Sequence, residues 1–405
     1  MAACTSYGDL LAARFFLGLF EAGCLPLFSI ITSQWFRRAE QPIRVAAWYS
    51  TNGIATIVAS ALSYGLGHIP SDTLEGWQII FLFVGLVTII TAPFVYWKLD
   101  NDIASARFLT EEEKPKALER LRANNTGTGS REFKWSHLLE MFTEPKTLLW
   151  FALAMLLNVG ASVTNTFGPL ILEGLGFDSY TTSLLNMQFG AMQFIVIIFA
   201  SWAAQRWKIK SVVLFSLTLP VIAGLAMLYT IPHTDGHEGS LLAGYYLLAF
   251  LFGGNPLIVA WIVANTAGTT KKSATMSLYN AGSSAGNIIG PILFQSADAP
   301  GYHPGLRAVL AIFVTLAACV VLQAANLMFL NKLQERKRVQ NGKPAKLVDH
   351  SMEDKYHDAN EQPEDYAIGV AEGDIETRPA HHTRIGDQAF LDLTDRKNDE
   401  FIYVY

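Results

Sequence analysis

Two charged residues, Arg14 and Glu21, stand inside an apolar segment near the start of the chain. The segment that holds them, residues 11–34, has the length and composition of a membrane-spanning helix. An ionisable side chain at the centre of a membrane costs about 2.5–3.5 kcal/mol on insertion scales, so such residues usually face a polar cavity and carry function. Seven residues of helix give about 700° of rotation, so both side chains project from nearly one face. We expect that face to be accessible to water.

The chemistry that this pair offers is anion binding and proton transfer. A guanidinium group matches the geometry of a carboxylate, so Arg14 is a candidate substrate-binding residue. A carboxyl group near the middle of a membrane can hold or release a proton, so Glu21 is a candidate proton carrier. The alternatives are that Arg14 extends to the membrane interface and that Glu21 only pairs with a neighbouring helix. Pro26 lacks an N–H and clashes with the carbonyl four residues before it, which predicts a kink near Ala22.

The helices that must position this pair are visible in the composition. Hydrophobic residues make up 51% of the 405 residues and charged residues 16%. The apolar residues gather in runs of about twenty, which is the length of a membrane span. We predict an all-α integral membrane protein with nine spans, at residues 11–34, 45–67, 77–97, 147–172, 181–205, 211–231, 240–264, 274–297 and 306–330.

Three asparagines inside the predicted spans are further candidates for substrate contact. Asn158 and Asn165 lie in the fourth span, and Asn280 lies in the eighth. Gly168 and Pro169 follow Asn165 closely, which should break the helix there and expose backbone polar groups to a cavity. Amides also join helices to one another in membranes, so a packing role stays open for all three asparagines.

A stripe of glycines runs along the eighth span, where Gly282, Gly286 and Gly290 repeat at every fourth position. Small residues at this spacing let another helix approach closely. The stripe predicts a helix-packing surface, either static or sliding during a transport cycle.

Basic residues are confined to alternate loops. Nine Lys and Arg residues fall between 98 and 146, whereas the loops at 68–76, 173–180, 232–239 and 298–305 contain none. Loops on the cytoplasmic side of a membrane carry an excess of Lys and Arg, so we place the basic loops and the C-terminus in the cytoplasm.

Four regions follow from this reading of the chain. Residues 1–97 form an incomplete N-terminal bundle of three spans, and residues 98–146 form a cytoplasmic connector with a short amphipathic helix after the capping sequence at Thr110. Residues 147–332 form a six-helix bundle. Residues 333–405 hold ten basic and sixteen acidic residues, and we predict a cytoplasmic, largely disordered tail.

The sequence around the charged pair resembles the fourth helix of the anion:cation symporter branch of the major facilitator superfamily. The matching positions are Arg14, Leu17, Gly18, Glu21, Ala22, Gly23 and Pro26. Trp261, Asn265 and Gly268, with the tail sequence from Asp395 to Asp399, resemble fungal permeases of the allantoate permease type. The resemblance implies a major facilitator helical bundle whose nine spans are family helices four to twelve, with no counterpart here of the first three. It also implies that Arg14 binds substrate and that Glu21 couples protons.

We therefore expect a secondary active transporter that moves a small organic anion together with protons across a lipid bilayer. The resemblance implies a carboxylate of the allantoate, ureidosuccinate or nicotinate kind, and we expect a monomer in the plasma membrane. The sequence shows no catalytic set, cofactor site, metal-ligand cluster or basic face suited to nucleic acid, so we do not expect an enzyme. Two alternatives stay open, a non-transporting nutrient sensor with a permease fold and an inactive truncated permease fragment.

Overall fold

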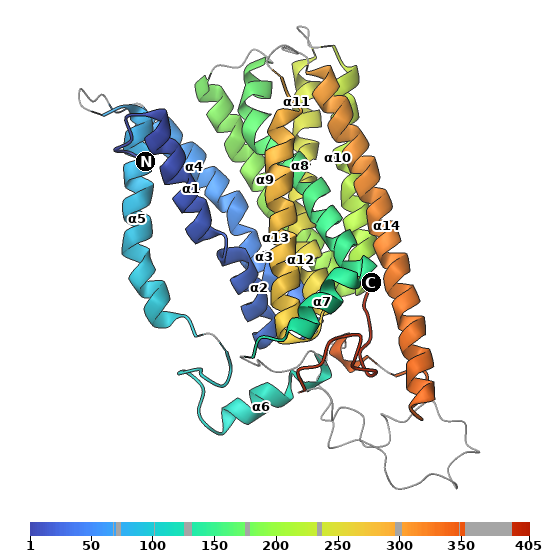
Figure 1. The fold of residues 1–405 in the computed structure, drawn as a ribbon. Helices are drawn as coiled ribbons and strands as arrows, with labels where there is room; N and C mark the ends of the chain where they lie inside the picture. The colour runs from blue at the N-terminus through green and yellow to red at the C-terminus, as the bar shows by residue number, and fades with distance from the viewer. Residues whose placement is uncertain are drawn as a thin grey trace.

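The computed structural model of the protein describes residues 1–67, 69, 74–100, 102–124, 132–174, 179–232, 237–295, 302–347, 349–352 and 391–405. Every regular element in these residues is a helix, and the long helices run roughly side by side (Figure 1). The prediction of an all-α protein is confirmed.

Five helices form the N-terminal bundle: α1 (Tyr7–Glu21), α2 (Cys24–Trp35), α3 (Gln41–Tyr49), α4 (Thr51–Gly67) and α5 (Gly76–Lys98). Figure 1 shows α1 and α5, in blue, at one edge of the molecule. Both helices are described in full, and neither contains a buried residue. Helix α5 is almost entirely apolar up to Lys98 at its end, which suits a lipid environment, whereas α1 also carries Asp9, Arg14 and Glu21.

The connector contains α6 (Glu113–Glu119), a short 3-10 helix (Arg122–Asn124) and α7 (Trp135–Thr143). The backbone N–H of Thr110 donates to the Glu113 carboxylate (2.9 Å), as the capping sequence predicts. Helix α7 was not predicted from the sequence; it packs against α13 and buries His137 and Met141.

The remaining long helices form the C-terminal bundle. They are α8 (Pro145–Gly174), α9 (Ser179–Trp207), α10 (Lys210–Thr230), α11 (Glu238–Leu247), α12 (Gly254–Ala264), α13 (Thr269–Ile292) and α14 (His303–Gln340). A 3-10 segment (Leu248–Gly253) joins α11 to α12, and another (His350–Met352) follows α14. The core consists mainly of this bundle, with Trp150, Trp261 and Phe313 among its fully buried side chains.

Seven helical stretches in the described chain have the length and apolar composition of a membrane span. Two of the nine predicted spans fall outside this group. The span predicted at 45–67 is divided between α3 and α4, and α4 has only 17 residues. The span predicted at 274–297 lies on α13, which carries Ser, Thr and Asn along its length. The count of nine crossings is therefore not confirmed, and neither is the absence of the first three family helices.

The chain bends at the position that Pro26 predicts, because α1 ends at Glu21 and α2 begins at Cys24. Pro26 has no N–H to offer the carbonyl of Ala22. That carbonyl accepts a hydrogen bond from Nδ2 of Asn280 on α13 instead (2.9 Å). Asn280 therefore compensates for the hydrogen bond that Pro26 removes, and it ties the bend to the C-terminal bundle.

Glycines allow two pairs of helices to touch backbone to backbone. Along the contact of α13 with α8, a Cβ added at Gly282 would lie 2.8 Å from the carbonyl O of Phe151, and one added at Gly290 would lie 2.7 Å from that of Val159. Between α4 and α9, a Cβ added at Gly53 would lie 2.6 Å from the carbonyl O of Gly190. The contact of α4 with α9 joins the two bundles.

Part of the tail is folded, which differs from the expectation of a largely disordered segment. Helix α14 continues to Gln340, and residues 391–405 lie against the lower end of the C-terminal bundle in Figure 1, in red. Thr394, Asp395 and Phe401 are fully buried there. We call this end, where residues 36–40, 207–210 and 265–272 also lie, the basic end. Residues 353–390 of the predicted tail lie outside the described residues.

The close approach of α4 and α9 gives a prediction about stability. We expect Gly53→Ala to lower the apparent melting temperature of the detergent-solubilised protein, at a cost of about 1–3 kcal/mol, because the added Cβ meets backbone that cannot move aside. Gly65→Ala on the same helix is the matched control, since nothing lies within 4 Å of its added Cβ. Ala is the better helix former, so Gly65→Ala should keep or raise the melting temperature. Equal melting temperatures for the two variants would contradict a tight crossing at Gly53.

Candidate substrate-binding site

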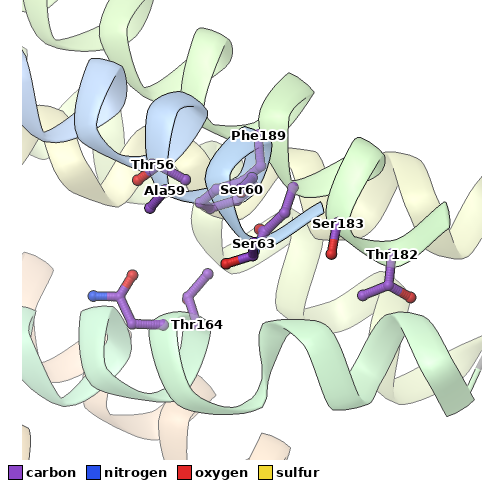
Figure 2. Close-up of a pocket in the computed structure, with 10 residues that line it drawn as sticks. Thr56, Ala59, Ser60, Ser63, Thr164, Thr182, Ser183 and Phe189 are labelled. Atoms are coloured by element: carbon purple, nitrogen blue, oxygen red, sulfur yellow. The ribbon is translucent and has the colours of Figure 1, made fainter. Parts of the chain in front are cut away.

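A polar cavity of about 370 Å³ lies between α4 of the N-terminal bundle and α8 and α9 of the C-terminal bundle. Figure 2 shows side chains from these three helices around it. Eight of its ten lining residues carry a hydroxyl or an amide, and none of the ten is charged. The lining consists of Thr56, Ala59, Ser60, Ser63, Thr164, Asn165, Thr182, Ser183, Asn186 and Phe189.

Helical periodicity explains why these residues converge. On α4, Thr56, Ser60 and Ser63 follow one another at intervals of four and three residues, which places their hydroxyls on one face. On α8, Thr164 donates to the carbonyl O of Gly160 (2.9 Å) within its own helix. The neighbouring Asn165 is exposed, so its amide is the group that α8 offers to a solute.

The α9 side of the cavity contains a hydroxyl without a partner. The Thr182 side chain is 3% exposed, and its Oγ1 makes no hydrogen bond to the described residues. Nearby, the amide oxygen of Asn186 accepts a hydrogen bond from the hydroxyl of Tyr245 (3.2 Å). A buried hydroxyl without a partner costs about 1–3 kcal/mol. A polar solute that hydrogen-bonds to Thr182 would remove that cost.

The cavity lies far from the basic end. Asn165 is 19 residues beyond Lys146 on α8, which corresponds to about 28 Å along the helix axis. Its uncharged donors and acceptors can bind either a neutral polar solute or a carboxylate. The lining itself therefore does not decide the charge of the substrate.

Asn158 lies in a buried network between helices and not in the cavity lining. Its Nδ2 donates to the carbonyl O of Ala154 (2.8 Å) and to Oδ1 of Asn255 on α12 (3.2 Å). The same Asn255 oxygen accepts from the hydroxyl of Tyr279 on α13 (2.8 Å). The network therefore joins three helices of the C-terminal bundle, α8, α12 and α13.

Arg14 and Glu21 are both exposed on α1, outside the cavity lining. The guanidinium of Arg14 lies 5.4 Å from the ring centroid of Phe81 on α5. No ion pair between Arg14 and Glu21 occurs in the described chain. Of the residues predicted to bind substrate or couple protons, Asn165 is the one that lines the cavity, and Asn280 binds the bend at Ala22.

A sequence model of the Major Facilitator Superfamily matches residues 1–291. The chain belongs to the major facilitator superfamily.

Relatives of this superfamily chain are fungal transporters, and none of those named here is an enzyme. It is 32% identical to an uncharacterized transporter of Schizosaccharomyces pombe over 410 residues, which cover 100% of this chain and 69% of the relative. It is 30% identical to the Thiamine pathway transporter THI73 of Saccharomyces cerevisiae, with 100% and 69% covered. It is 29% identical to the Allantoate permease of the same yeast over 343 residues, which cover 82% of this chain and 62% of the permease.

A solved structure shares the fold. The proton:xylose symporter XylE, a major facilitator protein, superposes with a TM-score of 0.54 at 12% sequence identity. The match covers 73% of this chain and 65% of the symporter. The likeness supports the major facilitator fold, and together with the apolar helices it identifies a multi-pass membrane protein.

Most residues of the cavity lining of this superfamily member were not predicted from the sequence. A signal was present on α4, because Thr56, Ser60 and Ser63 form a hydroxyl stripe in an otherwise apolar segment. On α9, Thr182, Ser183 and Asn186 stand near the start of the predicted fifth span. A hydroxyl can donate its hydrogen bond to a backbone carbonyl of its own helix, as Thr56 does to the carbonyl O of Asn52 (3.0 Å). The stripe alone therefore does not indicate a cavity.

Two asparagines seven residues apart on α8 should have different roles. We expect Asn158→Leu to lower the apparent melting temperature, by about 1–3 kcal/mol, because it leaves the buried Asn255 amide without one of its partners. Asn165→Leu serves as the matched control on the same helix and should change stability little, because this side chain is exposed. It should instead weaken solute binding measured by isothermal titration calorimetry. The assignment would be wrong if Asn165→Leu destabilised the protein as much as Asn158→Leu.

Proposed function

We propose that this chain is a secondary active transporter that moves a small organic anion together with protons. The observation that carries the proposal is the polar cavity between helices of the two bundles. This cavity lies far from the basic end, where the two bundles are also in contact. Major facilitator transporters work by rocking one bundle against the other around a central site. A cavity in one half of the molecule with contact at the other end is the arrangement that such a cycle requires.

The proposed substrate is a small carboxylate. Hydroxyl and amide donors of the cavity can bind carboxylate oxygens, and Arg14 is exposed on α1 and free of an ion pair within the described chain. The similarity to the Allantoate permease supports an organic anion as the class of substrate. In this proposal Arg14 attracts and orients the anion, while Asn165 holds it in the cavity.

The proposed coupling ion is the proton, and the proposed carrier is Glu21. Its carboxyl group is exposed on the same face of α1 as Arg14 and lies next to the bend at Ala22. A protonated Glu21 would add no negative charge to the face that Arg14 offers to the anion, whereas an ionised Glu21 would repel the anion. We place the basic end in the cytoplasm, as the loop charges predict.

Uptake measurements test the proposal. In yeast cells that lack their own allantoate permease, expression of the protein that contains this sequence should give saturable uptake of a labelled carboxylate such as allantoate. Uptake should rise as the external pH is lowered and should stop when a protonophore removes the proton gradient. A neutral analogue, such as the amide of the same compound, should be taken up much less. Uptake that depends neither on the pH gradient nor on the charge of the substrate would refute proton-coupled anion transport.

Glu21→Gln and Arg14→Lys should fail in different ways. Glu21→Gln fixes the uncharged state, so it should abolish accumulation driven by a pH gradient and keep part of the substrate exchange. Arg14→Lys keeps the charge but loses the planar donor pair, so it should raise the KM about tenfold or more without uncoupling transport. Asp9→Asn on the same helix and Arg44→Lys, which changes another exposed Arg stacked on an aromatic ring, are matched controls. Full proton-driven accumulation by Glu21→Gln would show that its carboxyl group is not the carrier.

A further inference from the structure

The last fifteen residues are bound to the basic end by a dense set of hydrogen bonds. Nε1 of Trp261 on α12 donates to the carbonyl O of Val404 (2.8 Å), and the Asn265 side chain bonds to the N–H (2.8 Å) and the C=O (2.9 Å) of the same residue. Asn331 on α14 bonds in the same way to both backbone groups of Tyr403 (2.8 Å each). Asn265 and Asn331 thus bind the backbone of two consecutive tail residues, as a binding groove binds the backbone of a peptide.

The tail also contacts the N-terminal bundle through one buried residue, Arg38, which lies between α2 and α3. Its guanidinium donates to the carbonyl O of Ile402 in the tail (2.7 Å) and to that of Ala264 at the end of α12. It also lies 4.8 Å from the ring centroid of Phe401. Arg38 is 1% exposed. A guanidinium from one bundle is therefore enclosed jointly by the other bundle and by the tail.

Asp395 places a negative charge of the tail beside buried lysines at this end of the molecule. It is fully buried and pairs with Lys146 of α8 and with Lys271 of α13 (3.0 Å). Lys271 also pairs with Glu140 (2.8 Å) and Glu144 (2.7 Å) of the α7 end. The hydroxyl of Tyr403 donates to Asp395 as well (2.8 Å).

We propose that residues 391–405 form a releasable latch that holds the basic end closed, with Asp395 as its electrostatic anchor and Arg38 as the point where it grips the N-terminal bundle. Opening the basic end requires Arg38 to leave Ala264, and the docked tail adds two further contacts that must break with it. The latch therefore favours the state in which the cavity is separated from the basic end. This inference deepens the proposed transport function, and its test does not depend on substrate or proton movement.

The composition of the docked segment makes its release feasible. Its buried side chains include the polar residues Thr394, Asp395, Asn398, Asp399 and Glu400. Buried ion pairs regain in attraction roughly what they lose in desolvation, so they contribute little net stability when intact. Removing one partner is nevertheless costly, because the other charges stay buried without compensation. The docked state should therefore be close to balance and sensitive to a single charge.

Glu144 makes this balance depend on pH. Burial raises the pKa of Glu144, Lys146 and Lys271 oppose the rise, and the negative charge of Asp395 adds to it. When the tail leaves, the two lysines remain and Asp395 departs, so the pKa of Glu144 falls and a proton is released. Release is therefore favoured as the pH rises through the docked-state pKa of Glu144. Glu140 contacts the same Lys271, and Tyr403 faces Asp395, so these groups complete the cluster.

Distance measurements between spin labels test the latch in the full chain. The three cysteines are replaced, and labels are placed at Ala47 on α3 and Lys332 on α14, two exposed positions near the basic end. In lipid nanodiscs the parent should give one short distance. Asp395→Asn should raise the ratio of long to short distances about tenfold or more, and a single label at the exposed Arg396 should become mobile. Arg396→Gln, which removes an exposed neighbouring charge, should give the parental distances in the doubly labelled protein.

Two further measurements distinguish release of the latch from misfolding and from a general effect of charge. A label pair within the C-terminal bundle, at Leu219 and Val321, reports whether a variant has folded. Phe401→Ala weakens the same latch without changing any charge, so it should also lengthen the distance between residues 47 and 332. In the parent that distance should lengthen as the pH rises, and Glu144→Gln should abolish the change. A released tail with an unchanged distance between 47 and 332, or a tail that stays immobile in both variants of a folded protein, would overturn the proposal.

Discussion

Arg38 is the residue on which the closed arrangement of the basic end depends. A buried guanidinium is costly unless most of its donors find acceptors. The Nη2 of Arg38 donates to carbonyls on α12 and on the tail, whereas its Nε has no hydrogen-bond partner among the described residues. The backbone N–H of Arg38 donates to the side chain of Asn124 in the connector (3.0 Å). The next residue, Ala39, donates its N–H to the carbonyl O of Ser351 beyond α14 (3.2 Å). One short loop of the N-terminal bundle is therefore held by four other parts of the chain.

Charged side chains are distributed unevenly along the molecule, so the basic end and the cavity are two different kinds of site. At the basic end, Lys146, Lys271 and Asp395 are buried and paired, which is expensive to rearrange. The cavity is lined by neutral groups, whose hydrogen bonds are each worth only about 0.5–1.5 kcal/mol. A solute can therefore enter and leave the cavity at small cost, whereas the basic end changes state only through a concerted loss of several interactions.

Much of the helical architecture could be predicted from sequence, because apolar run length and proline chemistry act locally. The bend at Pro26 lies where predicted, since the missing N–H is a property of that residue alone. The role of Asn280 could not be predicted, because the carbonyl that it binds lies 258 residues earlier. Asn158 and Asn165 look alike in the sequence, and only the packing of α8 against α12 separates a network residue from a cavity residue. The docked tail was missed for a related reason, since its acidic composition indicates disorder unless a template supplies partners.

Two of the contacts between the bundles differ in kind, and this difference has a mechanical consequence. At Gly53 and Gly190 the backbones of α4 and α9 approach closely because neither glycine has a side chain, so the helices can change their crossing angle while staying in contact. At Arg38 the contact consists of directional hydrogen bonds to Ala264 and Ile402, which are lost once the atoms separate by about an ångström. A rocking motion that keeps the first contact must break the second. The glycine contact is therefore suited to be the fulcrum of the motion, and the basic end is the part that opens.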